Sequence, residues 1–334
     1  VWGNRGPMTT VGVVIPVYRC ENYVRGCIES VLAQTRPVDQ IVLVDDCGGD
    51  RSIDIAVETL REHGREHRVI TQPRNGGLGR ARNTGLAVLT TDLVWFLDSD
   101  DTAAPEFVDT LVSAMNAADA QMSVTRTYRV DEHDRVLQID EARPLADAIT
   151  GAEYARELLR GRAKAYACTK LFERASLGTR PWAEDQAYED IATSIRVALS
   201  VDRVAMIETP LYRYLYREGS LSTAFSATTF DLFTADADVR ALVAGRGRGS
   251  EWDRDYLGYH YREVLTSIAH VAMRADHADE ADPELYRTAI NEVRQGISLS
   301  DIPVLWAGGH RREIVFAVLM KASPVLYSTI LRFR

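Results

Sequence analysis

Residues 93–101 read Leu-Val-Trp-Phe-Leu-Asp-Ser-Asp-Asp, so a run of five apolar residues leads directly into three carboxylates. A short apolar run without polar alternation predicts a strand that is buried on both faces. The carboxylates then lie at the carboxyl end of that strand, where open α/β sheets bind their ligands. Because clustered carboxylates repel one another, a divalent cation with oxygen ligands suits this position. An acidic surface turn that caps a helix is the alternative reading of the same residues.

The segments before this run alternate between strand and helix patterns. Apolar runs rich in β-branched residues are each followed by apolar residues at helical spacing. This alternation predicts right-handed βαβ units, and therefore an α/β fold with a mostly parallel, twisted sheet flanked by helices. The expected strands are 11–18, 41–46, 69–71 and 93–97, and the expected helices are 21–34, one that begins near Ser52, and one at about 80–89.

Five short motifs follow one another in the first hundred residues, and their order is more specific than any one of them. Together they resemble the family 2 glycosyltransferases, which have the Rossmann-like GT-A fold and use nucleotide-sugar donors. The resemblance continues more loosely to about residue 225 and then fades. The motifs are Val-Ile-Pro-Val-Tyr at 14–18, Ser-Val-Leu-Ala-Gln-Thr at 30–35, Val-Asp-Asp at 44–46, Asn-Gly-Gly-Leu at 75–78 with Ala-Arg-Asn-Thr-Gly at 81–85, and Leu-Asp-Ser-Asp-Asp at 97–101.

The resemblance implies a binding site for the donor base after the first two strands. Pro16, Val17 and Tyr18 would form the wall beside the base, and Asp46 would accept a hydrogen bond from it. An ionised carboxylate accepts hydrogen bonds but donates none, so Asp46 would select an N–H edge such as that of uracil. This favours a UDP-sugar as the donor. Asp45 is then expected to be the more structural member of the pair.

The same resemblance assigns the carboxylates at 98–101. Asp100 would be the direct metal ligand, and Asp98 would contact the metal site and the ribose or sugar of the donor, with Ser99 beside it. The expected ion is Mn²⁺ or Mg²⁺, which would bridge the diphosphate and neutralise the leaving nucleotide diphosphate. Asp101 is expected to cap a helix that begins near Pro105.

The glycine-rich segment at 76–79 has two readings. A dinucleotide loop is disfavoured, because Arg82 stands where the third glycine should be and the segment is not in the first βα turn. The resemblance implies instead that Gly77 lets the backbone approach the donor, and that Arg82 faces the nucleotide or the metal-site carboxylates. A structural ion pair of Arg82 with a core carboxylate is an alternative that does not exclude this role.

A second acidic segment precedes a helix pattern near residue 190. Displacement at the anomeric carbon needs a base for the acceptor hydroxyl, and by position in the family motif this is Asp190, with Glu189 beside it. The resemblance implies an inverting hexosyltransferase. An acidic N-terminal helix cap is the alternative reading of these two residues. Glu184 and Asp185 are nearby competitors for the role of base. The acceptor side is expected to include Lys170, Trp182, Glu184 and Asp185.

Residues 212–222 resemble a segment that follows the last core strand in many relatives. Arg217 and Ser220 would close over the donor diphosphate, since a guanidinium group can bind phosphate through two hydrogen bonds. An ordinary basic surface loop is the alternative.

Composition agrees with a cytoplasmic enzyme of more than one domain. The chain has 334 residues, in which no signal-peptide pattern is visible and no apolar run is long enough to cross a bilayer. Its four cysteines show no metal-binding spacing, which favours reduced thiols, and its net charge of −9 argues against nucleic acid as a partner. The expected domains are a GT-A catalytic domain at 9–228, divided into nucleotide-sugar binding at 9–125 and an acceptor side at 126–228, and a helical C-terminal region at 229–334.

The last residues, 311–334, form a tail that is both basic and apolar. One hypothesis is peripheral contact with the inner face of the cell membrane. The other is a terminal helix that packs on the catalytic domain or on a second copy in a homodimer.

The function expected from these observations is metal-dependent sugar transfer to a hydroxyl of a glycan or lipid-linked saccharide. Two alternatives stay open. A nucleotidyltransferase would also use a carboxylate-bound metal, but it would release pyrophosphate. A catalytically inactive partner subunit would bind the nucleotide sugar without turning it over.

Overall fold

The computed structural model describes residues 9–217 and 224–332. The chain divides into two compact units. The first comprises the described residues up to 155 together with 163–217, and the second comprises 156–162 and 224–332. The functional division into a donor part and an acceptor part, expected at residue 125, stays a prediction.

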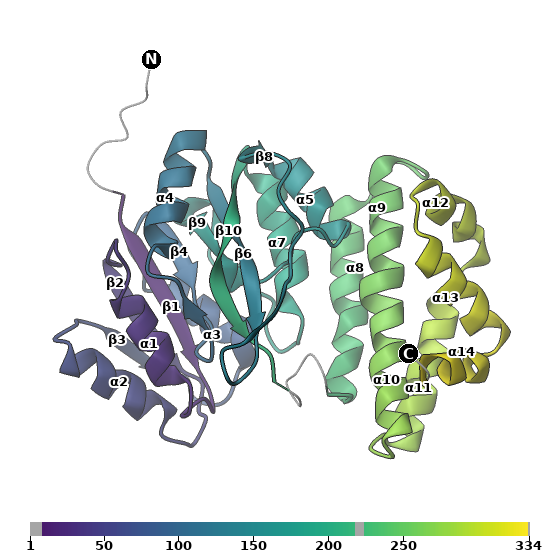
Figure 1. Ribbon diagram of the computed structural model, residues 1–334, viewed down its shortest axis with the longest axis horizontal. Coiled ribbons are helices and arrows are strands. Elements are labelled where there is room, and N and C mark those ends of the chain that lie inside the picture. Colours follow the sequence, from purple (N-terminus) through teal and green to yellow (C-terminus); the bar gives the residue numbers. More distant parts are fainter. Residues whose placement is uncertain (1–8, 218–223, 333–334) are drawn as a thin grey trace. The chain divides into compact units, whose positions relative to one another are not determined.

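A ten-stranded sheet is the centre of the described part of the first unit (Figure 1). Its main path runs β3-β2-β1-β4-β9-β6-β10-β5, while β7 pairs with β6 and β8 pairs with β10. The strands are β1 Val11–Val17, β2 Gln40–Asp45, β3 Arg68–Thr71, β4 Leu93–Phe96, β5 Thr102–Ala103, β6 Met122–Val130, β7 Val136–Ile139, β8 Ala148–Thr150, β9 Lys170–Glu173 and β10 Arg203–Leu215.

The first four strands of this path are parallel, as the alternation of strands and helices predicts. β9 then pairs antiparallel with both β4 and β6, and β6 is parallel to β10. The sheet is therefore parallel at its N-terminal end and mixed beyond β4. The α/β fold with a twisted sheet and flanking helices is therefore confirmed.

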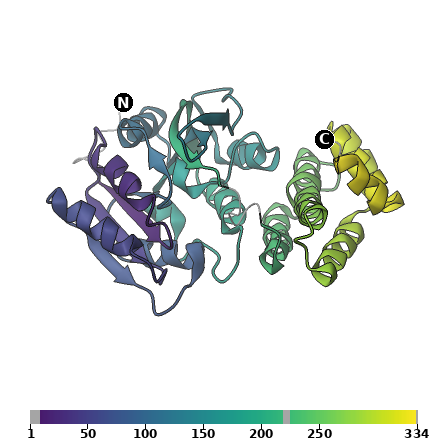
Figure 2. The same cartoon turned by 60° about the horizontal axis from the view of Figure 1, so that its bottom comes forward.

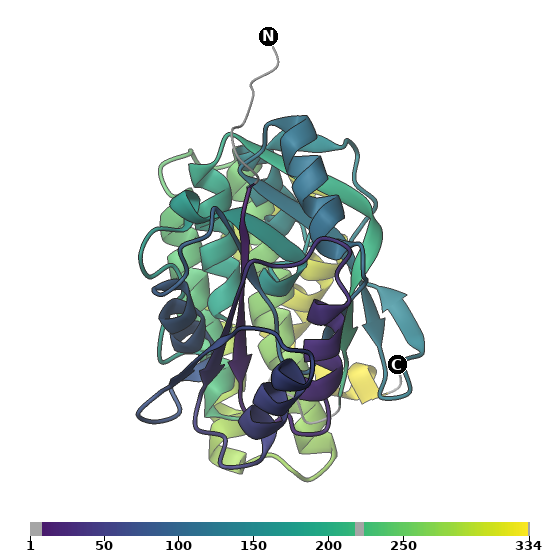
Figure 3. The same cartoon turned by 90° about the vertical axis from the view of Figure 1, so that its left-hand side faces the viewer.

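Helices cover both faces of the sheet. The odd-numbered residues of β1 face a core shared with α1, α2 and α4, whereas Val14 faces Gly85 in α3 on the other side. Figure 3 shows this unit from the side of α2 and β3. The helices of the unit are α1 Val24–Leu32, α2 Ser52–Glu62, α3 Gly77–Leu86, α4 Phe107–Ala118, α5 Gly151–Leu159, whose last turn belongs to the second unit, α6 Arg174–Leu177 and α7 Glu189–Ser200, with a 3₁₀ turn at Ala167–Thr169.

The prediction that Asp101 caps the helix near Pro105 is wrong. α4 begins at Phe107, and the residue before it is Glu106. The Asp101 side chain instead accepts hydrogen bonds from Tyr212 Oη and from the backbone N–H of Leu215, both at 2.8 Å. A buried carboxylate needs such donors, so Asp101 ties the loop after β4 to the distant strand β10.

The described residues of the second unit are helical (Figure 2). α9, a π-helical turn at His260–Thr266 and α10 follow one another without a break, which agrees with the helical C-terminal region expected from residue 229. Within the described residues, no helix is both long and apolar enough to cross a membrane. The helices are α8 Asp231–Val243, α9 Glu251–Tyr259, α10 Ser267–His277, α11 Pro283–Gly296, α12 Ile302–Ala307, α13 Arg311–Ala322 and α14 Pro324–Arg332, with 3₁₀ turns at Ala227–Phe230 and Leu299–Asp301.

Candidate active site

The predicted carboxylates gather where the parallel strands end. β1 lies between β2 and β4, because the chain continues from β1 to β2 and β3 on one side and then returns to the other side of β1 at β4. Asp46 directly follows β2, and Asp98 lies two residues after β4. Ligands of open α/β sheets bind at this kind of switch point, outside the carboxyl ends of the strands.

Arg82 is the centre of this group, and its side chain is fully buried. The guanidinium donates to Asp98 Oδ1 at 2.9 Å, to Glu189 Oε1 at 2.8 Å and to Asp190 Oδ1 at 2.5 Å. It also lies over the indole ring of Trp182, 5.0 Å from the ring centroid. One arginine of α3 therefore joins the loop after β4 to the start of α7, and it brings together three of the predicted site residues.

Three carboxylates share the single positive charge of Arg82, and burial decides which of them ionises least readily. Burial, followed by the neighbouring Asp190, raises the pKa of Glu189 to about 8. Burial also raises the pKa of Asp98, although Arg82 opposes this rise. A neutral Glu189 reduces the negative charge around the guanidinium, which lowers the cost of burying this cluster.

Asp190 is better placed than Glu189 to meet a substrate. Its side chain is 22 % exposed, against 8 % for Glu189. Its second oxygen, Oδ2, accepts a hydrogen bond from the backbone N–H of Ala167 at 3.3 Å. Asp190 is thus held in one orientation by Arg82 and Ala167 while part of its surface stays open to solvent.

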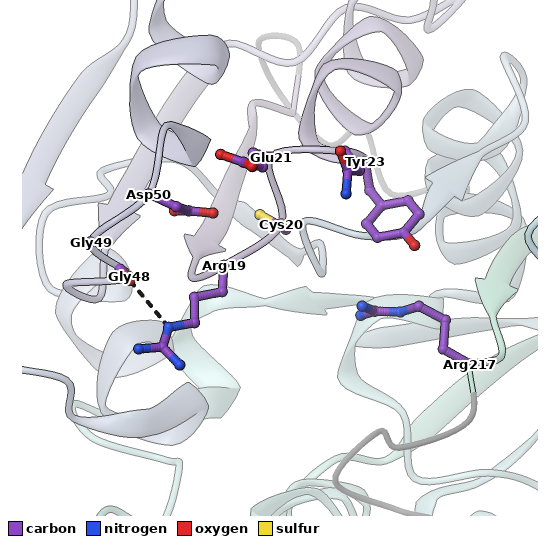
Figure 4. Close-up of a pocket in the computed structure, with 9 residues that line it drawn as sticks. Arg19, Cys20, Glu21, Tyr23, Gly48, Gly49, Asp50 and Arg217 are labelled. Atoms are coloured by element: carbon purple, nitrogen blue, oxygen red, sulfur yellow. Dashed lines mark hydrogen bonds between the residues drawn. The ribbon is translucent and has the colours of Figure 1, made fainter.

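A hollow of about 470 Å³ lies beside the strand ends (Figure 4). It is lined by residues 19–23 after β1, residues 48–50 after β2, and Arg217 after β10. Arg19 connects the first two segments by donating to the carbonyl of Gly48 at 3.2 Å. Two guanidinium groups therefore face one hollow at the carboxyl edge of the sheet, together with the carboxylates of Glu21 and Asp50, and each guanidinium can bind an anion through two hydrogen bonds.

Arg217 also reaches the predicted metal ligand. Its guanidinium forms an ion pair with Asp100 and lies 4.8 Å from the centroid of the Tyr23 ring. The Nε of Arg217 is buried and has no hydrogen-bond partner among the described residues. Ser220, predicted to act with Arg217, lies outside the described residues.

Asp46 has a larger structural role than the sequence suggests. It accepts hydrogen bonds from the backbone N–H groups of Gly76 and Gly77, at 2.7 and 3.0 Å, and from Gln72 Nε2 at 2.8 Å. Burial raises its pKa, and these hydrogen bonds oppose the rise. Asp45 accepts from the N–H of Cys47 at 3.0 Å. Asp46 thus anchors the glycine segment to β2, which reverses the expectation that Asp45 is the more structural of the two.

The wall predicted for the donor base is only partly exposed. Pro16 and Val17 are buried within β1, whereas Tyr18 is 40 % exposed. Ser99, predicted to contact the donor, is buried, and its Oγ accepts a hydrogen bond from Cys20 Sγ at 3.1 Å. Of these residues, Tyr18 offers the most surface to a ligand.

Two residues predicted to face the acceptor are instead buried. Lys170 donates from Nζ to the carbonyls of Lys164 and Tyr166, at 2.9 and 2.5 Å, and burial lowers its pKa to about 8. Trp182 is 2 % exposed and packs against Phe96, with ring centroids 5.1 Å apart. Neither side chain reaches solvent, so both residues stabilise the site without contacting a substrate.

The other two acceptor-side residues form ion pairs with α3. Glu184 accepts from Asn83 Nδ2 at 2.7 Å, and this hydrogen bond is the main reason why its pKa is lowered. Asp185 forms two hydrogen bonds with Arg80, at 2.7 and 2.6 Å. These contacts hold the segment before α7 against α3, so neither carboxylate is free of a basic or amide partner.

Sequence reasoning missed two residues that seat this segment. Asn83 donates to the Trp182 carbonyl at 2.8 Å and accepts from the Trp182 N–H at 3.1 Å. A Cβ added to Gly79 would lie 2.0 Å from the carbonyl oxygen of Ala183, so only glycine allows this approach. The signal was present in the motif around residues 79–85, but its partner segment cannot be identified without the fold.

A divalent cation such as Mg²⁺ needs several oxygen ligands close together. One three-residue cluster of candidate ligands occurs in the described part of the chain, formed by Asp98, Asp101 and Cys168. It fits poorly, because both oxygens of Asp101 already accept hydrogen bonds and a thiol is a poor ligand for Mg²⁺. Asp98 and Asp100 fit better, since both are partly exposed and Asp100 already attracts a cation, the guanidinium of Arg217.

Comparison with known proteins gives consistent results. Residues 12–177 match the family model described as Glycosyl transferase family 2. Glycosyltransferase GlyA of Streptococcus pneumoniae is 29 % identical over 294 residues, which cover 85 % of this chain and 41 % of that protein. The putative glycosyltransferase EpsH of Bacillus subtilis is 28 % identical over 228 residues, 66 % of this chain and 65 % of that protein. The chain thus spans less than two thirds of either relative.

The fold also matches a solved structure. Residues 1–349 of TarS from S. aureus, crystallised with UDP-GlcNAc, superpose with a TM-score of 0.72 at 18 % identity. The match covers 97 % of this chain and 91 % of that one, so it includes the helical second unit as well as the sheet.

Proposed function

We propose, from the membership of residues 12–177 in glycosyl transferase family 2, that this chain transfers a hexose from a UDP-sugar to a hydroxyl group of a glycan or lipid-linked saccharide. The observation that carries this proposal is the buried Arg82, which holds Asp98 and Asp190 together at the carboxyl edge of the sheet. One carboxylate faces the donor side and the other is oriented for proton transfer.

The donor would occupy the hollow beside β1 and β2. Arg19 and Arg217 would bind the diphosphate, since their guanidinium groups line this space. Tyr18 would lie beside the uracil, and Asp46 would keep the glycine segment in place around it. UDP is favoured as the nucleotide because the structural relative TarS was crystallised with UDP-GlcNAc and with UDP.

Asp100 and Asp98 would hold Mn²⁺ or Mg²⁺, and the bound ion would neutralise charge on the departing diphosphate. Arg217 would then exchange its ion pair with Asp100 for one with the diphosphate. Asp98 stays oriented throughout, because Arg82 holds one of its oxygens.

Asp190 would act as the base and give inversion at the anomeric carbon. Its carboxylate would take the proton of the acceptor hydroxyl while that oxygen bonds to C1 of the sugar and the C1–O bond to UDP breaks. Arg82 and Ala167 would fix its orientation, and Glu189 would stay protonated beside it. The acceptor side would be shaped indirectly by two segments, the turn before β9 and the segment before α7. The residues that hold these segments in place are Lys170, Trp182, Glu184 and Asp185.

The test begins with a thermal-shift screen of nucleoside diphosphates and nucleotide sugars, with and without Mn²⁺. A ligand that binds the folded state raises the melting temperature by mass action, and we expect the largest rise with a UDP-sugar and Mn²⁺. No rise with any uracil nucleotide would contradict the donor assignment.

Product analysis then separates the alternatives. Slow hydrolysis of the selected donor to sugar and UDP is expected from the isolated protein, at a rate reduced in Asp190→Asn. Release of pyrophosphate would instead indicate a nucleotidyltransferase. Binding without any turnover, in the presence of glycan acceptors, would indicate an inactive partner subunit.

A further inference from the structure

The last three helices expose an unusual amount of apolar surface. Trp306 in α12 is 59 % exposed, and Val325 in α14 is 76 % exposed. Val315 and Val318 in α13 lie three residues apart on the outward side of that helix. We name the whole set the apolar face: Trp306, Val315, Val318, Val325, Leu326 and Ile330, each at least 41 % exposed.

The helix α13 is apolar on its inner side as well. Phe316, Ala317 and Met320 are buried within the second unit, while Val315 and Val318 point outward. An ordinary surface helix is apolar on one side and polar on the other. A helix that is apolar on both sides indicates that something besides water covers the outer one.

Basic side chains accompany the apolar face. Residues 302–332 contain Arg311, Arg312, Lys321 and Arg332 but a single acidic residue, Glu313, so their net charge is 4 − 1 = +3, whereas the whole chain carries −9. The three arginines are exposed. The guanidinium of Arg311 lies 3.3 Å from the ring centroid of Trp306, which places a cation directly on the exposed indole.

We propose that α12, α13 and α14 form a docking surface for an anionic lipid bilayer. The apolar face would enter the boundary between headgroups and acyl chains, with the arginines at the level of the lipid phosphates. The proposed contact is peripheral, because the apolar residues and arginines that make it lie on the exposed sides of these helices. The surface belongs to the second unit and is independent of the proposed sugar transfer.

Charge favours lipid over a second copy of the chain as the occupant. In a two-fold symmetric dimer the same patch meets itself, so two surfaces of like charge would face each other across the interface. An anionic bilayer supplies the opposite charge along the whole surface. The surface differs in two ways from the tail predicted from the sequence at 311–334. It also includes α12 with Trp306, and it excludes Phe316 and Met320, which are buried in the protein interior.

The experiment is co-sedimentation of the full chain with vesicles of phosphatidylglycerol mixed with phosphatidylcholine, and with phosphatidylcholine alone. We expect binding to the anionic vesicles only, weakened by added salt because part of the attraction is screened. Arg312→Gln with Arg332→Gln should weaken binding about 25-fold, since each basic residue near the surface contributes about fivefold. Trp306→Ser with Val325→Ser should abolish binding while leaving the melting temperature unchanged.

The matched control is Arg61→Gln with Leu145→Ser, which removes one exposed arginine and one exposed apolar residue from the first unit. It should bind vesicles as the unaltered chain does. The proposal is overturned if the full chain ignores anionic vesicles, or if the control loses binding as strongly as the test variants. It is also overturned if the apolar-face variants instead convert a dimer to a monomer in sedimentation analysis. Donor hydrolysis should be equal in all these variants, so failure here is distinguishable from failure of the proposed function.

Discussion

Asp190, at the start of α7, accepts a hydrogen bond of 2.5 Å from the fully buried Arg82 of α3, which lies 108 positions earlier in the chain. The same guanidinium contacts Asp98 after β4. The proposed base and a proposed donor-binding carboxylate are thus oriented by one side chain. Arg82 is therefore expected to matter for both stability and catalysis.

Replacing Arg82 by methionine should destabilise the protein by about 3–5 kcal/mol, because removal of one partner leaves buried carboxylates without compensation. The free energy of unfolding from denaturant titration measures this. Arg25→Met is the control, since Arg25 pairs with Glu62, both side chains are about half exposed, and exposed pairs contribute roughly 0–1 kcal/mol. Equal effects of the two variants would show that the Arg82 cluster is no more than a surface network.

Stability should depend on pH through Glu189. Its pKa is about 8 in the folded protein, against 4.5 for an ordinary glutamate, so between these values the folded state binds the extra proton. Protonation of Glu189 therefore contributes to the free energy of unfolding, on the order of a few kcal/mol. This contribution is fully present below about pH 4.5 and is lost as the pH rises through 8. Glu189→Gln keeps a neutral side chain at every pH.

Denaturant titrations of the two proteins from pH 5 to 9 test this directly. The unaltered chain should lose stability relative to Glu189→Gln as pH increases. Parallel curves would mean that Glu189 is already ionised at neutral pH and pairs with Arg82 as an anion.

The sequence was sufficient to predict the parallel strands and the carboxylates at their ends. Buried parallel strands are continuous apolar runs, and the polar residue that follows such a run marks its end. Asp46 and Asp98 were located in this way, directly after β2 and two residues after β4. The helical second unit was equally evident, because its apolar residues keep a helical spacing over long segments.

Partners that meet only in the folded chain could not be predicted. The role of Asp101 depends on Tyr212, 111 positions away, and the role of Lys170 depends on how the turn before β9 folds back, because Nζ reaches the carbonyls of Lys164 and Tyr166 in that turn. A family motif indicates which residues matter, but it does not distinguish a side chain that touches a ligand from one that holds a loop. Burial makes this distinction, and burial is a property of the fold.

Asp190→Asn should reduce turnover about 10²–10⁴-fold, the usual contribution of a positioned base, while binding of UDP stays unchanged. The amide keeps the shape of the carboxylate but cannot take the proton. Single-turnover kinetics and a separate UDP titration measure the two effects. Glu184→Gln and Asp185→Asn are comparison variants, and the base has been misassigned if either of these loses turnover while Asp190→Asn keeps it.

Lys170→Met should lower turnover more than donor affinity. The substitution leaves the Lys164 carbonyl without this donor and the Tyr166 carbonyl with Thr169 Oγ1 alone, which loosens the turn whose Ala167 N–H orients Asp190. An unsatisfied buried acceptor costs about 1–3 kcal/mol, so a loss of stability should accompany the effect. Lys164→Met is the control, because it removes a charge from the same turn but keeps the carbonyl. A purely structural lysine would lower stability without a change in the turnover of the folded fraction.

Arg217 and Mn²⁺ should compete for the carboxylate of Asp100, and binding measurements can detect this competition. Their ion pair must open before a cation binds Asp100, so Arg217→Gln should bind Mn²⁺ alone more tightly while it binds UDP more weakly. Asp100→Asn should lose the Mn²⁺-dependent part of UDP binding without a change in fold, as shown by calorimetry and circular dichroism. Chelation by EDTA should have the same effect on the unaltered chain. If UDP binds equally well in EDTA, and Arg217→Gln leaves Mn²⁺ affinity unchanged, the carboxylates after β4 do not hold a metal, and Arg217 itself supplies the positive charge at the diphosphate.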